Sequence, residues 1–241
     1  RPLHTYHQNV EGTRIVLEAM AAAGVTKIVF SSSAAVYGTP DVPLVVEDLP
    51  KRPASPYGES KLIGEWLIAD QARATADTEA PLRHTSLRYF NVVGSADPSV
   101  YDTSPHNLFP IVFEKLIAGE TPRINGDDYD TPDGTNVRDY VHVGDIAAAH
   151  VAAAQRLIAG EPIEAAYNLG SQNGLSVREI MDAMARVTGI AFTPEVGPRR
   201  PGDPDRIVAT GELAARDLDW QMRYSIDEMV RTGWEARQNA L

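Results

Sequence analysis

The chain has 241 residues, of which 43% are hydrophobic and 23% charged, and it contains no cysteine. This composition is ordinary for a soluble globular protein of one large domain or two modest ones, and it excludes disulfides and thiolate chemistry. The net charge is −11 and the basic residues are scattered, so we expect no nucleic-acid partner and no membrane surface. Apolar runs fall short of the ~18 residues of a membrane span, and the opening RPLHTYHQNV has no hydrophobic signal core. We expect a cytoplasmic protein.

The first part of the chain alternates between helical and strand patterns. In residues 9–23 apolar side chains recur at helical spacing, and Gly24 follows as a stop signal. The next stretch, KIVFSSSAAVYG, begins like a strand buried in a parallel sheet and then breaks into serines. A proline-rich loop over residues 39–56 leads to a second helix at 57–71, and residues 82–94 are typical of a second buried strand. This alternation predicts an α/β fold, a Rossmann-like doubly wound parallel sheet.

The rest of the chain has a different pattern. Helices are expected over residues 107–119, 144–159 and 176–188, and a turn rich in Gly and Asp, NGDDYDTPDGTNVRDYVHV, separates the first two. We therefore expect a smaller, loop-rich part interleaved into the C-terminal half of the sheet domain.

The helix at 57–71 begins within SPYGESK, which places Tyr57 and Lys61 one turn apart. A tyrosine hydroxyl has an unperturbed pKa of ~10, so it is a poor base at neutral pH unless something stabilises the phenolate. The Lys61 ammonium would do so by its charge, and a bound nicotinamide cation would add a second positive field. Ser33 follows the preceding buried strand, and open α/β sheets bind ligands at such strand ends. The alternative is an exposed helix face that happens to carry both residues.

Seven short sequence motifs follow one another along the chain: NVEGT, KIVFSSSAAVYG, SPYGESK, LRYFNVVG, DGTNVRDYVHVGDIAAAH, YNLGS and PRRPGD. In order and spacing the chain resembles the extended short-chain dehydrogenase/reductase family, and within it the UDP-hexose 4-epimerases, over essentially its whole length. The resemblance implies NAD-dependent interconversion of UDP-glucose and UDP-galactose. In that reaction a 4-keto sugar forms by hydride transfer to NAD⁺, turns over and takes the hydride back on its other face.

The resemblance also implies roles for individual residues. Tyr57 matches the catalytic base, Lys61 the lysine that also holds the nicotinamide ribose, and Ser33 the serine that shares the proton with the sugar's 4-hydroxyl. No metal site is implied. The residues expected to bind NAD are Ser31, Ser33, Tyr57, Lys61, Tyr89 and Phe90.

A second set of residues matches the UDP-sugar site. Arg138 and Arg200 have fork-shaped donors that suit phosphates, although either arginine could instead form an ordinary ion pair. Asn107 could equally cap the helix that follows it. Asn125 stands where the family commonly has an aromatic side chain that stacks on uracil. The implied set is Ser33, Tyr57, Asn91, Asn107, Leu108, Arg123, Asn125, Arg138, Arg200, Asp203 and Ile207.

Ile207 and Asn9 each have two readings, and His142 has one that is preferred. Ile207, in GDPDRIVAT, matches a residue on the wall beside the sugar's 2-substituent, or it points into the core. Asn9 matches an asparagine near the cofactor, or it caps its helix. For His142 a packed core histidine is the better interpretation.

The resemblance further implies how the chain is organised. Residues 1–95 would be the C-terminal part of an NAD-binding Rossmann domain. Residues 96–241 would mainly bind the UDP-sugar, with segments at about 138–170 returning to the Rossmann domain. The Gly-rich fingerprint of a dinucleotide site is not found, so we expect the natural protein to continue upstream of Arg1 with it, and this piece alone to hold no dinucleotide. Helices 9–23 and 57–71 are expected to pair in a homodimer.

The same family includes enzymes with other activities. Sugar-nucleotide 4,6-dehydratases need an acid pair at the strand end, where this chain has Ser31, Ser32 and Ser33. Another UDP-sugar epimerase, a decarboxylase and a non-catalytic UDP-sugar-binding relative remain as alternatives.

Overall fold

Helix and strand alternate through the first 90 residues of the computed structural model, which describes residues 1–240. The chain begins as one helical run made of α1 (Pro2–Tyr6), the π-helical turn η1 (His7–Glu11) and α2 (Gly12–Ala22). The helix thus begins before residue 9, where the apolar pattern predicted its start. Pro2 can stand in the first turn because the N–H that proline lacks would have no helical partner there.

The next elements match the predicted order. Strand β1 (Lys27–Ser31) is followed by the short 3-10 turn η2 (Ala34–Tyr37), helix α3 (Pro56–Thr75) and strand β2 (Arg83–Tyr89). Helix α3 begins where it does because Ser55 accepts a hydrogen bond from the Gly58 N–H at 3.2 Å, and Pro56 follows the cap.

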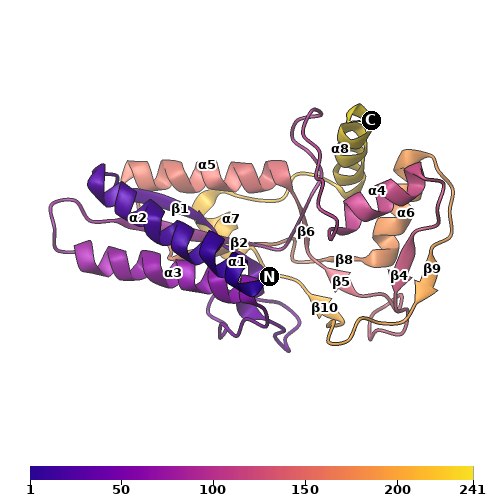
Figure 1. Cartoon of the computed structure of the whole chain (residues 1–241), viewed down its shortest axis with the longest axis horizontal. Coiled ribbons are helices and arrows are strands. Elements are labelled where there is room, and N and C mark those ends of the chain that lie inside the picture. Colours follow the sequence, from indigo (N-terminus) through magenta and orange to yellow (C-terminus); the bar gives the residue numbers. More distant parts are fainter. Residues whose placement is uncertain (241) are drawn as a thin grey trace. The chain divides into compact units, whose positions relative to one another are not determined.

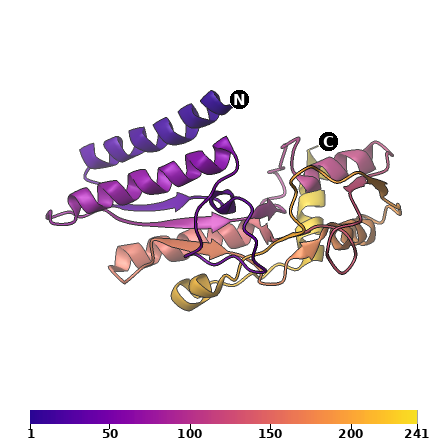
Figure 2. The same ribbon diagram turned by 90° about the horizontal axis from the view of Figure 1, so that it is seen from below.

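Strand β2 lies in the middle of a parallel sheet. It pairs with β1 on one side and with β7 (Ala166–Leu169) on the other, which gives the order β1-β2-β7. The views in Figures 1 and 2 show these strands between α2 and α3 on one side and α5 (Val143–Ala159) on the other. The prediction of a doubly wound parallel sheet is confirmed.

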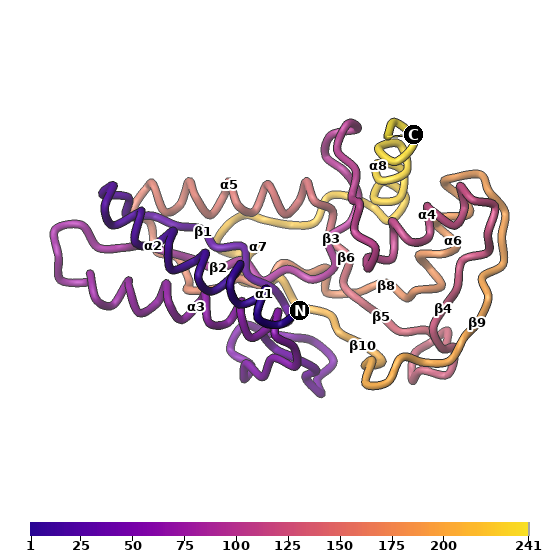
Figure 3. Tube along the Cα trace, viewed as in Figure 1, coloured from indigo at the N-terminus to yellow at the C-terminus, as the bar shows by residue number. Residues whose placement is uncertain are grey.

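The chain divides into two units. Unit 1 comprises residues 1–90, 147–169 and 209–221, and unit 2 comprises 91–146, 170–208 and 222–241. The colours of Figure 3 show that the late helix α7 (Glu212–Leu218) belongs with the indigo and purple elements of unit 1. The sequence did not indicate this late return. The assignment of the units to NAD and UDP-sugar binding stays a prediction.

The strand expected over residues 82–94 is two strands. It is interrupted at Phe90, after which β3 (Asn91–Val93) pairs in parallel with β6 (Tyr140–His142) inside unit 2. Aromatic and β-branched residues stand on both sides of the break, with no Gly or Pro between them, which is why the pattern alone did not reveal it.

Unit 2 packs three helices around an apolar core: α4 (Leu108–Ile117), α6 (Val177–Thr188) and α8 (Ile226–Asn239). Phe113, Met184 and Met229 are almost completely buried in it. Two short sheets complete the unit; their strands are β4 (Arg123–Asn125) with β9 (Glu195–Gly197), and β10 (Arg206–Ile207) with β5 (Val137–Arg138) and β8 (Leu175–Ser176). Within residues 1–240 no helix combines the length and the apolar character that crossing a membrane requires.

Candidate functional site

The end of β1 meets one stripe of helix α3. Tyr57, Lys61 and Glu65 stand on successive turns of that helix. The Lys61 ammonium donates to the Ser31 carbonyl oxygen at 3.0 Å, and the Ser32 hydroxyl donates to Glu65 Oε1 at 2.5 Å. The Ser33 hydroxyl is near enough to Tyr57 to lower its pKa. Two serines of the strand end are thus hydrogen-bonded to the stripe, and the third acts on its tyrosine.

Two glycines let α3 lie this close to the strand end. A Cβ atom at Gly58 would stand 2.4 Å from the Ala35 carbonyl oxygen, and one at Gly64 would stand 2.7 Å from the Phe30 ring. Any larger side chain at either position would push the helix away from the serines. The glycine of the motif SPYGESK is therefore needed for packing.

Asn9 braces the start of the stripe. Its side chain donates to the Ser60 hydroxyl at 2.8 Å, and that hydroxyl donates to the Tyr57 carbonyl oxygen at 2.7 Å. Asn9 lies inside the continuous helical run rather than at its start, so the capping alternative is wrong.

The electrostatics of Tyr57 differ from the expectation. Partial burial raises the pKa of Tyr57, and the hydrogen bond from Ser33 acts in the opposite direction. Lys61 was expected to lower that pKa by charge, but its ammonium binds the Ser31 carbonyl and lies 5.8 Å from the centroid of the Tyr57 ring. Burial also lowers the pKa of Lys61. The residue as a whole is 45% exposed.

A buried polar network lies behind the stripe, and the sequence analysis missed it. The Arg88 guanidinium on β2 grips the Glu65 carboxylate through Nε at 2.9 Å and Nη2 at 2.6 Å. Its Nη1 donates to the Tyr37 hydroxyl at 2.8 Å, which donates to Asn168 Oδ1 at 2.8 Å. Burial raises the pKa of Tyr37 to about 12. Glu65 could have been found by extending the Tyr57–Lys61 spacing by one more turn.

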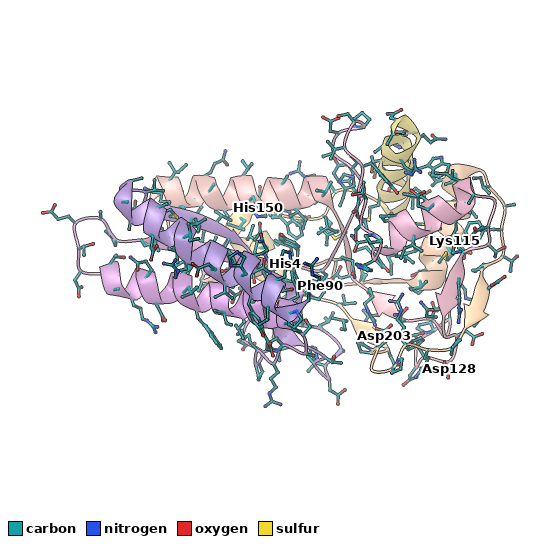
Figure 4. The ribbon with its side chains drawn as sticks, in the orientation of Figure 1. His4, Phe90, Lys115, Asp128, His150 and Asp203 are labelled. Atoms are coloured by element: carbon teal, nitrogen blue, oxygen red, sulfur yellow. The ribbon has the colours of Figure 1, made fainter. Side chains whose placement is uncertain are left out.

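His150 on α5 is a second residue that the sequence analysis missed. The residue is labelled in Figure 4. Its Nε2 lies 2.8 Å from the Ser31 hydroxyl, and its ring centroid lies 6.3 Å from that of Tyr89. Unit 1 thus gathers five of the residues expected to bind NAD around one strand end, and Phe90 follows Tyr89 at the end of β2.

Unit 2 contains the rest of the predicted substrate set. Arg138 on β5 forms an ion pair with Asp203 and also donates to the carbonyl oxygens of Val137 and Pro204, both at 2.7 Å. The ion-pair alternative for Arg138 is therefore what the structure shows. Ile207 on β10 is half-buried and in register with Arg138, so it lies at the surface of this small sheet rather than fully inside the core.

The strand pair β4–β9 carries two more of these residues. The Asn125 carboxamide, with its oxygen turned toward Arg200, accepts from Nε and Nη2 at 3.2 Å. The Arg123 guanidinium lies across Gly197, where a Cβ atom would approach Arg123 Nε to 1.9 Å. Arg199, which was not among the predicted residues, stacks on Tyr129 with its Cζ 3.9 Å from the ring centroid.

The remaining residues are placed by their own contacts. Asn107 stands at the N-cap of α4, but its side chain donates to Asp102 at 2.9 Å and makes no capping hydrogen bond. Leu108 packs against the core of unit 2, and the Asn91 side chain donates to the Asp139 carbonyl at 3.0 Å. His142 is fully buried and stacked on Tyr224 at 3.7 Å between centroids, which confirms it as a packed histidine.

The chain is similar in sequence and in structure to proteins named UDP-glucose 4-epimerase. UDP-glucose 4-epimerase 4 of Oryza sativa subsp. japonica is 43% identical over 97% of this chain, and UDP-glucose 4-epimerase of Lactobacillus helveticus is 41% identical over 98% of it. The crystal structure of UDP-glucose-4-epimerase from Stenotrophomonas maltophila with bound NAD and formylated UDP-arabinopyranose has a TM-score of 0.91 and 38% identity, over 99% of this chain and 71% of that one.

The chain spans only part of these relatives. It covers 64% of the rice protein and 71% of the Lactobacillus protein. The model of the NAD dependent epimerase/dehydratase family matches residues 1–170. With this match over most of its length, and with relatives more than 40% identical, the chain belongs to the NAD dependent epimerase/dehydratase family.

Proposed function

We propose that the protein interconverts UDP-glucose and UDP-galactose with NAD as its cofactor. The observation that carries this proposal is the meeting of Tyr57, Lys61 and Ser33 at the end of β1, where an exposed phenol stands beside a hydroxyl and an ammonium. The relatives named UDP-glucose 4-epimerase support the same reaction.

The donors at this strand end suit a nicotinamide nucleotide. The Lys61 ammonium donates one N–H to the Ser31 carbonyl oxygen. Its remaining N–H groups suit ribose hydroxyls. Ser31, Tyr89 and Phe90 would complete the contact. When bound, NAD⁺ supplies a hydride acceptor for the sugar C4 atom and a positive charge.

Tyr57 would take the proton of the sugar's 4-hydroxyl, and Ser33 would share it. Because burial raises the pKa of Tyr57, the phenol keeps its own proton at neutral pH unless positive charge is added nearby. Tyr57 becomes a base only in the loaded enzyme, which ties proton removal to the presence of the hydride acceptor.

The arginines of unit 2 would hold the UDP group. Arg138 keeps a fixed orientation through Asp203 and two backbone carbonyls, and it is not fully buried. Arg200 is oriented by Asn125. Guanidinium forks of this kind bind phosphate oxygens in pairs. The binding energy of the nucleotide would retain the 4-keto sugar while it turns.

Ile207 would limit which sugars are accepted. Its β-branched side chain is stiff, so a bulky acetamido group on the sugar would meet a fixed apolar wall, and such rejection is worth ~1–3 kcal/mol. Weak activity on UDP-N-acetylglucosamine is expected, and Ile207→Ala should raise it more than activity on UDP-glucose. An unchanged ratio of kcat/KM values would place Ile207 away from the sugar.

We also propose that the protein is a cytoplasmic homodimer that pairs through α2 and α3. Apolar side chains on these helices are unusually exposed for their size: Ile15 is 51%, Val16 48% and Trp66 56% exposed. A second copy would bury them. Light scattering of the wild type and of Trp66→Glu would separate dimer from monomer.

The proposed reaction is tested by supplying UDP-galactose and NAD⁺ to the natural full-length protein and measuring UDP-glucose. Formation of UDP-glucose is expected. Binding of UDP-galactose without turnover would indicate the non-catalytic alternative. Release of CO₂ from UDP-glucuronate in place of epimerisation would indicate a decarboxylase.

A further inference from the structure

The stripe on α3 has a third member that the proposed reaction does not use. Glu65 accepts a hydrogen bond from the Ser32 hydroxyl, just as the Ser31 carbonyl accepts one from Lys61. Ser33, the next residue, lowers the pKa of Tyr57. Ser32 is fully buried, and its backbone N–H donates to the Leu87 carbonyl at 2.9 Å. Neither Ser32 nor Glu65 is therefore placed to contact the sugar, yet Ser32 is joined to Ser33 by a single peptide bond.

The Glu65 carboxylate is itself held rigidly. Arg88 grips it through two N–H groups, and the two side chains are 6% and 10% exposed, for Arg88 and Glu65 respectively. The remaining nitrogen of the guanidinium, Nη1, donates to the Tyr37 hydroxyl at 2.8 Å and to the Glu47 carbonyl oxygen at 3.2 Å. The acceptor that meets Ser32 is thus fixed from β2, η2 and the loop before α3.

Stability alone does not explain an ion pair at this place. Removing two charges from water is costly, and well-packed apolar side chains of similar volume often stabilise a protein as much or more. What a bidentate pair adds is direction, because it fixes the carboxylate relative to both the helix and the strand. Ser32, which this carboxylate holds, directly precedes Ser33, the residue that lowers the pKa of Tyr57.

We propose that Glu65, held by Arg88, is a positioning residue that sets Ser33 and Lys61 against Tyr57 through Ser32. This inference rests on the proposed epimerase reaction. Glu65 acts through Ser32 and never touches the substrate, so its loss should reduce the rate of the chemical step while leaving the binding of the UDP-sugar intact.

The test compares Ser32→Ala with Ser86→Ala in the NAD-loaded enzyme. Both serines are buried, Ser32 directly after β1 at 0% exposure and Ser86 within β2 at 2%, but only Ser32 links to Glu65. For Ser32→Ala we expect kcat for UDP-galactose to fall about 10- to 100-fold, because small misplacements of reacting groups cost this much, with KM nearly unchanged. Ser86→Ala should keep kcat within about twofold. Glu65→Asp, which keeps a charge for Arg88 but withdraws it from Ser32, should follow Ser32→Ala.

The pH profile adds a readout that a purely structural role would not move. The Ser33 hydrogen bond lowers the pKa of Tyr57, so a displaced Ser33 should shift the rising limb of kcat/KM to higher pH in Ser32→Ala and not in Ser86→Ala. Equal kcat and equal profiles for the two variants, with an active wild type, would overturn the inference while leaving the proposed function standing. A wild type that converts no UDP-galactose would overturn both.

Discussion

Arg88 in unit 1 and Arg138 in unit 2 both pair with a carboxylate, but water reaches the two pairs differently. The side chains of Arg88 and Glu65 are 6% and 10% exposed, whereas those of Arg138 and Asp203 are 14% and 22% exposed. The Arg88 guanidinium donates to Glu65 on α3, to the Tyr37 hydroxyl on η2 and to the Glu47 carbonyl in the loop before α3. Paired arginines can therefore have different uses. In the proposed function, Arg88 stiffens the strand end that carries Ser33, and Arg138 meets a phosphate of the nucleotide.

The largest expected effect is on the catalytic rate, through a change in unit 1. Tyr57→Phe removes the proton acceptor while the ring still packs, so kcat should fall about 10²- to 10⁴-fold, with UDP-galactose affinity almost unchanged. Tyr6→Phe is a matched control, because the Tyr6 hydroxyl bonds Glu59 on the helix side away from the serines. Steady-state kinetics and calorimetric binding measure the two effects. A Tyr57→Phe enzyme with near wild-type turnover would show that another group takes the proton.

The next effect concerns stability and the buried pair. Glu65→Ala leaves the Arg88 charge buried without its partner, which typically costs about 3–5 kcal/mol of unfolding free energy. Glu235→Ala breaks the Arg231–Glu235 pair, whose side chains are 51% and 49% exposed, and should cost less than about 1 kcal/mol. Urea unfolding of both variants measures the difference. Similar losses would mean that burial does not distinguish the two pairs.

A smaller effect, on the affinity for UDP, is expected when the guanidinium of Arg138 is replaced. Arg138→Lys keeps the positive charge but loses the bidentate geometry, and a hydrogen bond to a charged group is worth about 1.5–3 kcal/mol. UDP should therefore bind about 10- to 100-fold more weakly to this variant in titration calorimetry. Arg199→Lys is the control, since Arg199 pairs with Asp128 and Asp205. Equal losses at the two positions would remove Arg138 from the nucleotide site.

The smallest expected effect is a pH dependence of stability, caused by the buried His142 of unit 2. Burial lowers the pKa of His142, which faces Asp145, Glu228 and Arg231. Because the folded state disfavours the imidazolium, the stabilising contribution of the neutral ring is complete above the unfolded pKa of ~6.5. It is lost as the pH falls through the lower folded pKa. Each unit by which the folded pKa lies below the unfolded pKa contributes about 1.4 kcal/mol to the free energy of unfolding.

The structure indicates why protonation of His142 is unfavourable. Its Nδ1 accepts from the Gly144 N–H at 2.9 Å, and its Nε2 lies 3.0 Å from the Thr232 hydroxyl. A proton on Nδ1 would face that donor. The melting temperature of the wild type should therefore drop more between pH 7.5 and 5.5 than that of His142→Gln. Parallel slopes would exclude His142 as the acid-sensitive group.

Much of unit 1 could be predicted because its signals are local. The helical spacing before Gly24, the apolar run in KIVF and the motif SPYGESK each reflect short-range rules of periodicity and capping. The π-helical turn at His7–Glu11 and the earlier helix start were missed, because polar residues conceal the continuation of the helix.

Unit 2 and the polar network were harder to predict. Helix α8 was missed although Ser225 and Glu228 form a capping box at its start, a signal that the sequence does contain. The partnership of Arg88 with Glu65 and Tyr37 depends on sheet pairing between distant segments, which no local pattern encodes. The raised pKa of Tyr57 was missed for the same reason, since burial is a tertiary property.

The way unit 1 is assembled from three separated segments has a consequence for folding. The hydrogen bond between Tyr37 and Asn168 joins residues 131 positions apart, and β7 can pair with β2 only after the intervening residues of unit 2 have been synthesised. Contacts of such long sequence separation slow folding. While the chain emerges from the ribosome, the edge of β2 lies open to wrong partners. The yield of active protein should therefore fall more steeply with rising temperature and concentration during synthesis than the stability of the finished molecule would suggest.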